Sequence, residues 1–179
     1  VVGFYYYNKE SGKFEYRQGA VMTNLLLADE INRTSSRTQS ALLEVMEEGQ
    51  VTVDGVTRSV PEPFFVIATQ NPVGSSGTQM LPESQVDRFM VLLSMGYPSI
   101  REEMILMSQR KVSDPLDNVH EVISKEELLS MQNAVNEIKV SPLIYQYIAM
   151  LSDATRRHDM IQLGVSPRGS LALCRMAKA

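Results

Sequence analysis

The sequence predicts an α/β fold: a parallel-sheet core with β-hairpin inserts, followed by a small all-α domain. Two observations predict this class. Short apolar runs, which suit strands covered on both faces, alternate with helical patterns as far as about residue 97. Beyond that point the sequence has repeated N-cap patterns that predict helices and no further strand. We therefore assign residues 1–97 to an α/β core and residues 98–179 to a helical domain.

The core elements follow from local pattern. Apolar runs at residues 25–28, 64–69 and 90–94 predict buried strands, and the first of them is wholly apolar. A capping box that begins at Ser36 predicts a helix with apolar residues at helical spacing. A short helix is expected at residues 81–89, directly before the third strand.

Two segments have the pattern of β-hairpins. Aromatic runs at residues 4–7 and 14–17 flank a polar turn. Residues 51–58 contain Asp54-Gly55, a pair that accepts the positive φ angles of a tight turn. Both hairpins are expected to belong to the α/β part of the chain.

The helical part is marked by four serines, each suited to be a helix N-cap. Two are followed three residues later by glutamate and two are followed by proline. They are Ser99, Ser124, Ser141 and Ser166. The chain starts within an expected strand and stops within an expected helix, so we expect both ends to be cut from a longer protein.

Composition narrows the class of protein. The 179 residues have a formal net charge of −4 and a pI near 5.3, which gives no general electrostatic reason to bind nucleic acid. No apolar run approaches the roughly 20 residues that a membrane-spanning helix needs. The single cysteine, Cys174, excludes an internal disulfide. We expect a cytoplasmic protein without membrane insertion.

The strongest chemical signal is the pair Asp29-Glu30 at the end of the first apolar run. In an open parallel sheet, ligands lie beyond the carboxyl ends of the strands. Asp29 would hold Mg²⁺ through water, and Glu30 would polarise a water molecule for attack on a phosphate. The alternative is that the pair only ends a strand and caps the next helix.

Asn71 follows the second apolar run, where an amide can donate and accept hydrogen bonds without adding charge. Taken alone, Asn71-Pro72 is as typical of a turn. Arg88 lies at the end of the short expected helix, where it could neutralise charge on a phosphoryl group or pair with Asp87 or Glu83. Arg168 lies in a first helical turn, where the helix dipole disfavours a cation, so a phosphate or a carboxylate should compensate it.

In wording, the segments NLLLADEINR, TQSALLEVMEEGQVTVDG, PFFVIATQNP, LPESQVDRFM and SPRGSLAL closely resemble the MoxR family of AAA+ ATPases. The resemblance covers nearly the whole chain. It implies a P-loop NTPase core with a helical lid, ATP and Mg²⁺ as cofactors, and five site residues. Asp29 and Glu30 match the Walker B pair, Asn71 matches sensor 1, Arg88 the arginine finger and Arg168 sensor 2.

The resemblance also implies a ring oligomer, usually a hexamer, with chaperone-like roles beside partners that carry von Willebrand factor A domains. Both hairpins match inserts that this family shares with helicases and chelatases. Whether Arg168 serves its own site or a neighbour's is left open, and Arg33 matches the family pattern without an assigned role.

One family feature is missing from these residues: the Gly-rich Walker A loop that ends in Gly-Lys-Thr or Gly-Lys-Ser. The Gly74–Thr78 segment has no lysine and lies on the wrong side of Asn71. We therefore expect this fragment alone to hydrolyse ATP slowly or not at all. A DNA-remodelling motor and a non-hydrolysing scaffold are the alternatives; Arg58 is among the hairpin cations that could contact phosphates.

Overall fold

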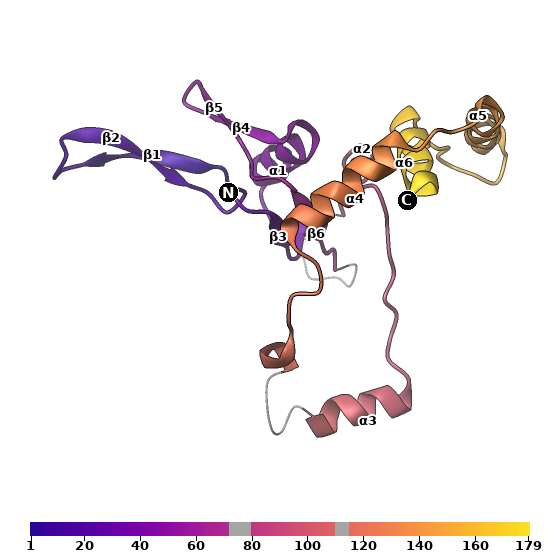
Figure 1. Ribbon diagram of the computed structural model, residues 1–179, viewed down its shortest axis with the longest axis horizontal. Helices are drawn as coiled ribbons and strands as arrows, with labels where there is room; N and C mark the ends of the chain where they lie inside the picture. The colour runs from indigo at the N-terminus through magenta and orange to yellow at the C-terminus, as the bar shows by residue number, and fades with distance from the viewer. Residues whose placement is uncertain (72–79, 110–114) are drawn as a thin grey trace.

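The computed structural model describes residues 1–71, 80–109 and 115–179 (Figure 1). The glycine-containing segment at residues 74–78 therefore lies outside the described residues. All the described strands come before residue 69, and only helices follow residue 80. This order agrees with the α/β core and helical lid that the sequence predicts.

Two of the expected strands form a parallel pair. β3 (Leu25–Ala28) pairs with β6 (Phe65–Ala68) in the register Leu25↔Phe65 to Ala28↔Ala68. Both strands are wholly apolar, but only one face is covered by the described residues, since Leu25 and Leu27 are 58% and 64% exposed. The expectation that these strands are covered on both faces is therefore wrong for the described structure. Their carboxyl ends lie at one edge of the sheet, where Asp29 and Thr69 follow.

The third expected strand, at residues 90–94, is wrong for the described structure. This segment is extended but pairs with no described strand, and Leu92 and Leu93 are each 81% exposed. A strand exists only when a neighbour accepts its backbone hydrogen bonds. The preceding helix is also shorter than expected, since α2 covers only Glu83–Val86.

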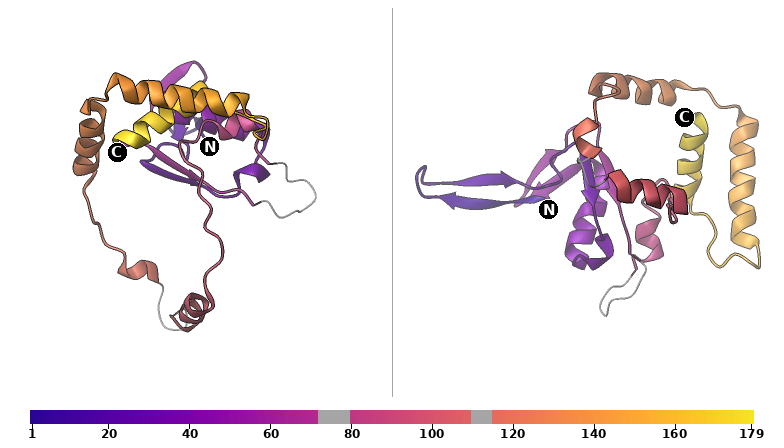
Figure 2. Two further views of the ribbon diagram at one scale, coloured as in Figure 1. Left: turned by 90° about the vertical axis from the view of Figure 1, so that its right-hand side faces the viewer. Right: turned by 90° about the horizontal axis from the view of Figure 1, so that it is seen from below.

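Both hairpins are confirmed. β1 (Gly3–Asn8) pairs with β2 (Lys13–Gln18), and β4 (Gln50–Val53) pairs with β5 (Val56–Ser59). Asp54 and Gly55 have φ angles of 50° and 79°, as a tight type I′ turn requires. The first hairpin projects from one side of the molecule, and α5 and α6 lie on the other (Figures 1 and 2).

Arg58 joins the two hairpins. Its guanidinium carbon lies 3.8 Å from the centre of the Tyr16 ring and 5.4 Å from that of Tyr5. Its Nη2 also donates to the Tyr5 hydroxyl at 2.6 Å. Arg58 is therefore engaged in a cation–π contact between the hairpins.

α1 (Ser36–Glu48) begins one residue earlier than expected. Ser35 is the N-cap, and its side chain accepts from the Thr38 N–H at 3.2 Å. The expected cap Ser36 is instead the first helical residue. Gly49 ends the helix with a φ angle of 64°, which glycine adopts without steric cost.

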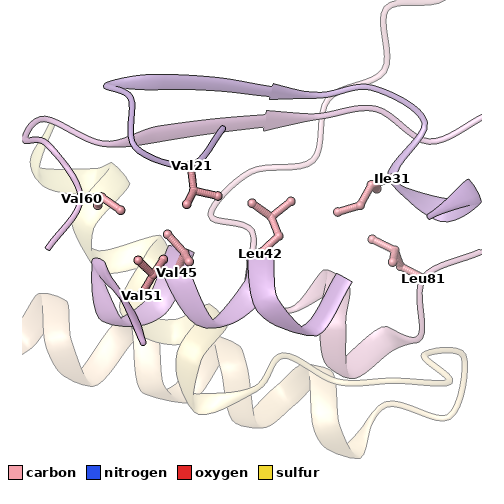
Figure 3. Close-up of a cluster of buried hydrophobic side chains, with 7 residues drawn as sticks. All are labelled: Val21, Ile31, Leu42, Val45, Val51, Val60 and Leu81. Carbon is pink, nitrogen blue, oxygen red and sulfur yellow. The ribbon is translucent and has the colours of Figure 1, made fainter. Parts of the chain in front are cut away.

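The core lies between α1 and the strands (Figure 3). Its buried apolar side chains come from α1, from the strands and from the connections between them. They are Val21, Ile31, Leu42, Val45, Val51, Val60 and Leu81. Each such side chain contributes about 1.5–3 kcal/mol when fully buried. This packing holds the parallel pair against α1.

The remaining helices follow in order: α3 (Ile100–Gln109), the 3-10 turn η2 (Pro115–Asn118), α4 (Lys125–Glu137), α5 (Pro142–Arg157) and α6 (Pro167–Lys178). All four expected serine caps are confirmed: Ser99, Ser124, Ser141 and Ser166. The Ser170 hydroxyl donates to that of Ser152 at 2.9 Å and links α6 to α5. Among the described residues, no helix is both long and apolar enough to span a membrane.

Candidate functional site

Polar side chains gather at the carboxyl edge of the β3–β6 pair. Asp29 and Glu30 follow β3, while Thr69 and Asn71 follow β6. Because the two strands are parallel and in register, their ends meet at the same edge. We call these four residues the acidic edge. Three of them are site residues predicted from the sequence, and the fold brings them together.

Glu30 is held in an uncommon backbone conformation. Its φ and ψ angles are both 48°, in the left-handed region that non-glycine residues seldom adopt. One carboxylate oxygen, Oε1, accepts from Asn71 Nδ2 at 3.4 Å, and the other, Oε2, lies 3.1 Å from Arg33 Nε. Arg33 is the last residue of the 3-10 turn η1 (Ile31–Arg33), which directly follows Glu30. The structure thus gives Arg33, to which the sequence assigned no role, a direct contact with Glu30.

Thr69 is a member of this edge that the sequence did not identify. Its hydroxyl donates to Asp29 Oδ1 at 2.5 Å and accepts from the Glu30 N–H at 2.8 Å. The only signal in the sequence is its position directly after an apolar run. Asn32 lies next to the acidic edge and was also not identified from the sequence: it is 5% exposed, and its Nδ2 donates to the Asn71 carbonyl at 3.3 Å.

Two further predicted residues meet elsewhere. Arg88 and Arg168 share the carboxylate of Glu47, Arg88 with its Nη1 at Oε2 and Arg168 with its Nη2 at Oε1. Arg168 Nη1 also lies 3.7 Å from Asp87 Oδ2, and Asp87 Oδ1 accepts from the Ser166 hydroxyl at 2.6 Å. We call Glu47, Asp87, Arg88 and Arg168 the arginine cluster.

The local sequence explains why Arg168 needs this partner. Ser166 caps α6 and Pro167 occupies its first turn, so Arg168 lies where the helix dipole disfavours a cation. The sequence left open whether a phosphate or a carboxylate compensates it. In this structure the compensating group is the carboxylate of Glu47.

A pocket of about 280 Å³ adjoins the arginine cluster. Three arginines and two carboxylates line it, among apolar side chains such as Met46 and Leu171. The third arginine is Arg175, about two turns further along α6 than Arg168. The excess of positive charge suits an anionic group from outside the chain.

The acidic edge and the arginine cluster lie at opposite ends of α1. Gln39, in the first turn of α1, donates to the Ile31 carbonyl at 3.2 Å and so holds η1 at the start of the helix. Glu47 lies in the last turn. At 1.5 Å per residue, Gln39 and Glu47 are roughly 12 Å apart along the helix axis. Figure 3 shows Ile31 at one end of α1 and Val45 toward the other.

Asp29 fits the way in which Mg²⁺ is bound in proteins. Its Oδ1 is engaged by Thr69, while its Oδ2 has no hydrogen bond or ion pair to the residues that the structure describes. No group of three or more acidic, histidine or cysteine side chains forms a metal cage within those residues. Mg²⁺ keeps several waters and commonly takes only one or two carboxylates, with phosphate oxygens as further ligands.

Comparisons with known proteins show the family of the chain. The family model described as "ATPase family associated with various cellular activities (AAA)" matches residues 1–91, and that of the AAA lid domain matches residues 153–179. The chain therefore belongs to the AAA ATPase family. Within it, the chain is of the MoxR type.

The relatives show how much of such a protein is present. The chain is 51% identical to "Uncharacterized protein YeaC" of Bacillus subtilis, over all of the chain and 56% of that protein. It is 36% identical to "Chaperone MoxR1" of Mycobacterium tuberculosis, over all of the chain and 49% of that protein. The crystal structure of a "putative ATPase" from Cytophaga hutchinsonii matches with a TM-score of 0.86 at 38% identity, covering 99% of this chain and 56% of that one. The chain thus spans about half the length of the curated relatives it matches.

Proposed function

We propose that the protein hydrolyses ATP as a subunit of a MoxR-type ring and uses the energy to remodel partner proteins. The acidic edge is the observation that carries this proposal. It combines two carboxylates and an amide at the edge of a parallel sheet where nucleotides bind in this class of fold. The family membership given above supports ATP as the ligand.

Each residue of the acidic edge has a distinct role in this proposal. The Glu30 carboxylate accepts a hydrogen bond from the attacking water and draws its proton away as the water approaches the γ-phosphate. The Asn71 amide contacts Glu30 and would also donate a hydrogen bond to the phosphate. An amide suits this role because it donates hydrogen bonds without adding charge. Asp29 would hold Mg²⁺, and the ion would supply positive charge to neutralise the phosphate oxygens.

Arg88 and Arg168 serve the site of a neighbouring subunit in this proposal. Their shared contact with Glu47 supports treating them as one unit. They lie at the far end of α1 from Glu30 of the same chain, which supports action between subunits for both. An arginine supplied in this way stabilises the charge that develops on the transferred phosphoryl group. Each site then requires two copies of the chain.

These residues include no phosphate-binding loop in the sequence, so we propose that the isolated 179-residue piece turns over ATP slowly or not at all. In the full-length protein, residues 1–97 act as part of the ATPase core and residues 98–179 as the lid. We propose a hexameric ring in the cytoplasm, with a von Willebrand factor A domain protein or another client as partner. The name of the Mycobacterium relative supports a chaperone-like role.

DNA remodelling is the less favoured alternative. Arg58, one of the hairpin cations that could contact phosphates, is engaged with Tyr16 and Tyr5. A gel shift of the full-length protein that weakened with rising salt would favour this alternative.

The decisive experiment measures ATP turnover by the full-length protein and its Glu30→Gln variant. We expect Glu30→Gln to lower turnover by about 10³-fold or more while ATP is still bound. A protein that binds its partner without any nucleotide turnover would instead be a scaffold, and unchanged turnover in Glu30→Gln would contradict the proposal.

Mixed rings test which subunit supplies each arginine. Neither Glu30→Gln nor Arg168→Ala is expected to be active alone. Mixing them restores intact sites only if Arg168 acts on a neighbour, to about a quarter of the wild-type rate for random assembly. No recovery would assign Arg168 to its own subunit's site. The same design with Arg88→Ala tests the arginine finger.

A further inference from the structure

We infer that Thr69 is a positioning residue that sets both carboxylates of the acidic edge for the reaction; this inference rests on the proposed function. Thr69 makes a hydrogen bond to each of the four residues from Ala28 to Ile31. Its N–H donates to the Ala28 carbonyl at 3.1 Å, and its carbonyl accepts from the Ile31 N–H at 3.0 Å. Its hydroxyl bonds to Asp29 and to the Glu30 N–H, as described above.

The hydroxyl replaces a missing bond of the parallel ladder. Phe65 N–H donates to the Asn24 carbonyl and Thr69 N–H to the Ala28 carbonyl, which fixes the ladder's register. In evenly spaced parallel pairing, the Thr69 carbonyl would next accept from the Glu30 N–H. It accepts from Ile31 instead. The Glu30 N–H, displaced by the left-handed backbone, is satisfied by the Thr69 side chain.

The hydroxyl can bond in only one sense here. A carboxylate oxygen only accepts and a backbone N–H only donates, so the Thr69 proton must point to Asp29 and its lone pair to Glu30. One side chain therefore fixes the Asp29 carboxylate and the backbone of Glu30 together. The Glu30 backbone conformation in turn sets the direction in which the Glu30 side chain points.

A valine at this position has nearly the same shape but no hydroxyl. It would leave the Glu30 N–H without its partner and the Asp29 carboxylate without its fixed donor. Such a change should misplace the reacting groups while leaving the contacts that bind nucleotide in place. Misplacement by about 1 Å can lower a rate by roughly 100-fold. Serine keeps the hydroxyl and should restore most of the loss.

The test compares Thr69→Val and Thr69→Ala with Thr69→Ser in the full-length protein. The matched control is Thr57→Val, which removes a hydroxyl from an exposed cross-strand pair with Thr52 on the second hairpin. Two quantities are measured: kcat and KM for ATP, and amide hydrogen exchange of the segment 28–33 without nucleotide.

We expect Thr69→Val and Thr69→Ala to lower kcat by about 10- to 100-fold with less than about a threefold change in KM. Both should speed exchange at the Glu30 amide, whereas Thr69→Ser and Thr57→Val should not. If the valine variant does not fold, the alanine variant decides the question. Wild-type kcat in both, beside an inactive Glu30→Gln, would overturn the role of Thr69 and leave the proposed function intact. Full turnover in Glu30→Gln would overturn the proposed function itself.

Discussion

The acidic edge and the arginine cluster are built in different ways. In the acidic edge, backbone groups of one strand end bond to the next, and Thr69 ties the residues from Ala28 to Ile31 into a fixed arrangement. In the arginine cluster, part-exposed side chains from α1, from α6 and from the residues directly after α2 meet through one carboxylate, Glu47. The first group is fixed by the sheet, whereas the second is held by charge.

This difference suits what each region has to do in the proposed mechanism. Groups that prepare a water must keep one geometry, and backbone-anchored hydrogen bonds provide it. Arginines that leave their own subunit's carboxylate for a neighbour's phosphate must be able to exchange partners. Part-exposed ion pairs contribute only about 0–1 kcal/mol, so such an exchange costs little.

After the loss expected for Glu30→Gln, the largest effect on turnover is expected at the arginine cluster. Arg88→Ala in the full-length protein should lower kcat for ATP hydrolysis by about 10³-fold, because the developing phosphoryl charge loses its cation. Arg101→Ala, which changes an exposed arginine in α3, is the control. Steady-state turnover and a nucleotide titration check the result. A loss of ATP binding equal to the loss of turnover would assign Arg88 to binding instead.

A smaller effect is expected at Asn71 in the acidic edge. Asn71→Ala should lower kcat by about 10- to 100-fold, because the amide that contacts Glu30 Oε1 is removed while Glu30 remains. Asn71→Asp keeps the shape but adds a negative charge next to Glu30, so it should be at least as inactive. Single-turnover kinetics separate the chemical step from binding. An Asn71→Asp protein with wild-type turnover would show that the amide is not needed.

A change at Glu47 tests whether the cluster is held by charge. Glu47→Gln removes the carboxylate that competes with phosphate for both arginines. We expect the assembled ring to bind ATP about threefold more tightly at low salt, with the difference shrinking as salt screens it. Glu44→Gln, one turn earlier on the exposed side of α1, is the matched control. Weaker binding in Glu47→Gln would mean that Glu47 orients the arginines rather than competing for them.

The smallest effect on turnover is expected outside both regions. Arg58→Ala removes the cation–π contact between the hairpins and should lower the free energy of unfolding by about 1 kcal/mol. Turnover should stay near the wild-type level. Thermal denaturation measures the first quantity, with Arg17→Ala on the exposed side of β2 as control. Equal melting temperatures for Arg58→Ala and wild type would show that the contact adds no stability.

The sequence predicts the elements whose signals are local. The Asp54-Gly55 turn and the four serine caps need only a few neighbouring residues to be recognised, and the structure contains all of them. The strand expected at residues 90–94 fails for the opposite reason. Its apolar run matches a strand, but pairing requires a neighbour that no local pattern can report.

The site residues likewise fall into those that local sequence patterns predict and those that they do not. Asp29, Glu30 and Asn71 stand at strand ends, so their meeting follows from a parallel sheet. Thr69 and Glu47 were not identified, because each acts through a partner far away in the sequence. Glu47 also lies among other glutamates of α1, which the sequence gives no reason to rank. Long-range partners of this kind become visible only when the chain is folded.

The left-handed backbone of Glu30 has a consequence for anyone who engineers this protein. Glycine or asparagine adopts φ near 48° more readily than glutamate. A selection for thermal stability alone should therefore favour replacing Glu30. In the proposed mechanism the more stable variants would be catalytically inactive. Libraries built on this scaffold should keep position 30 constant.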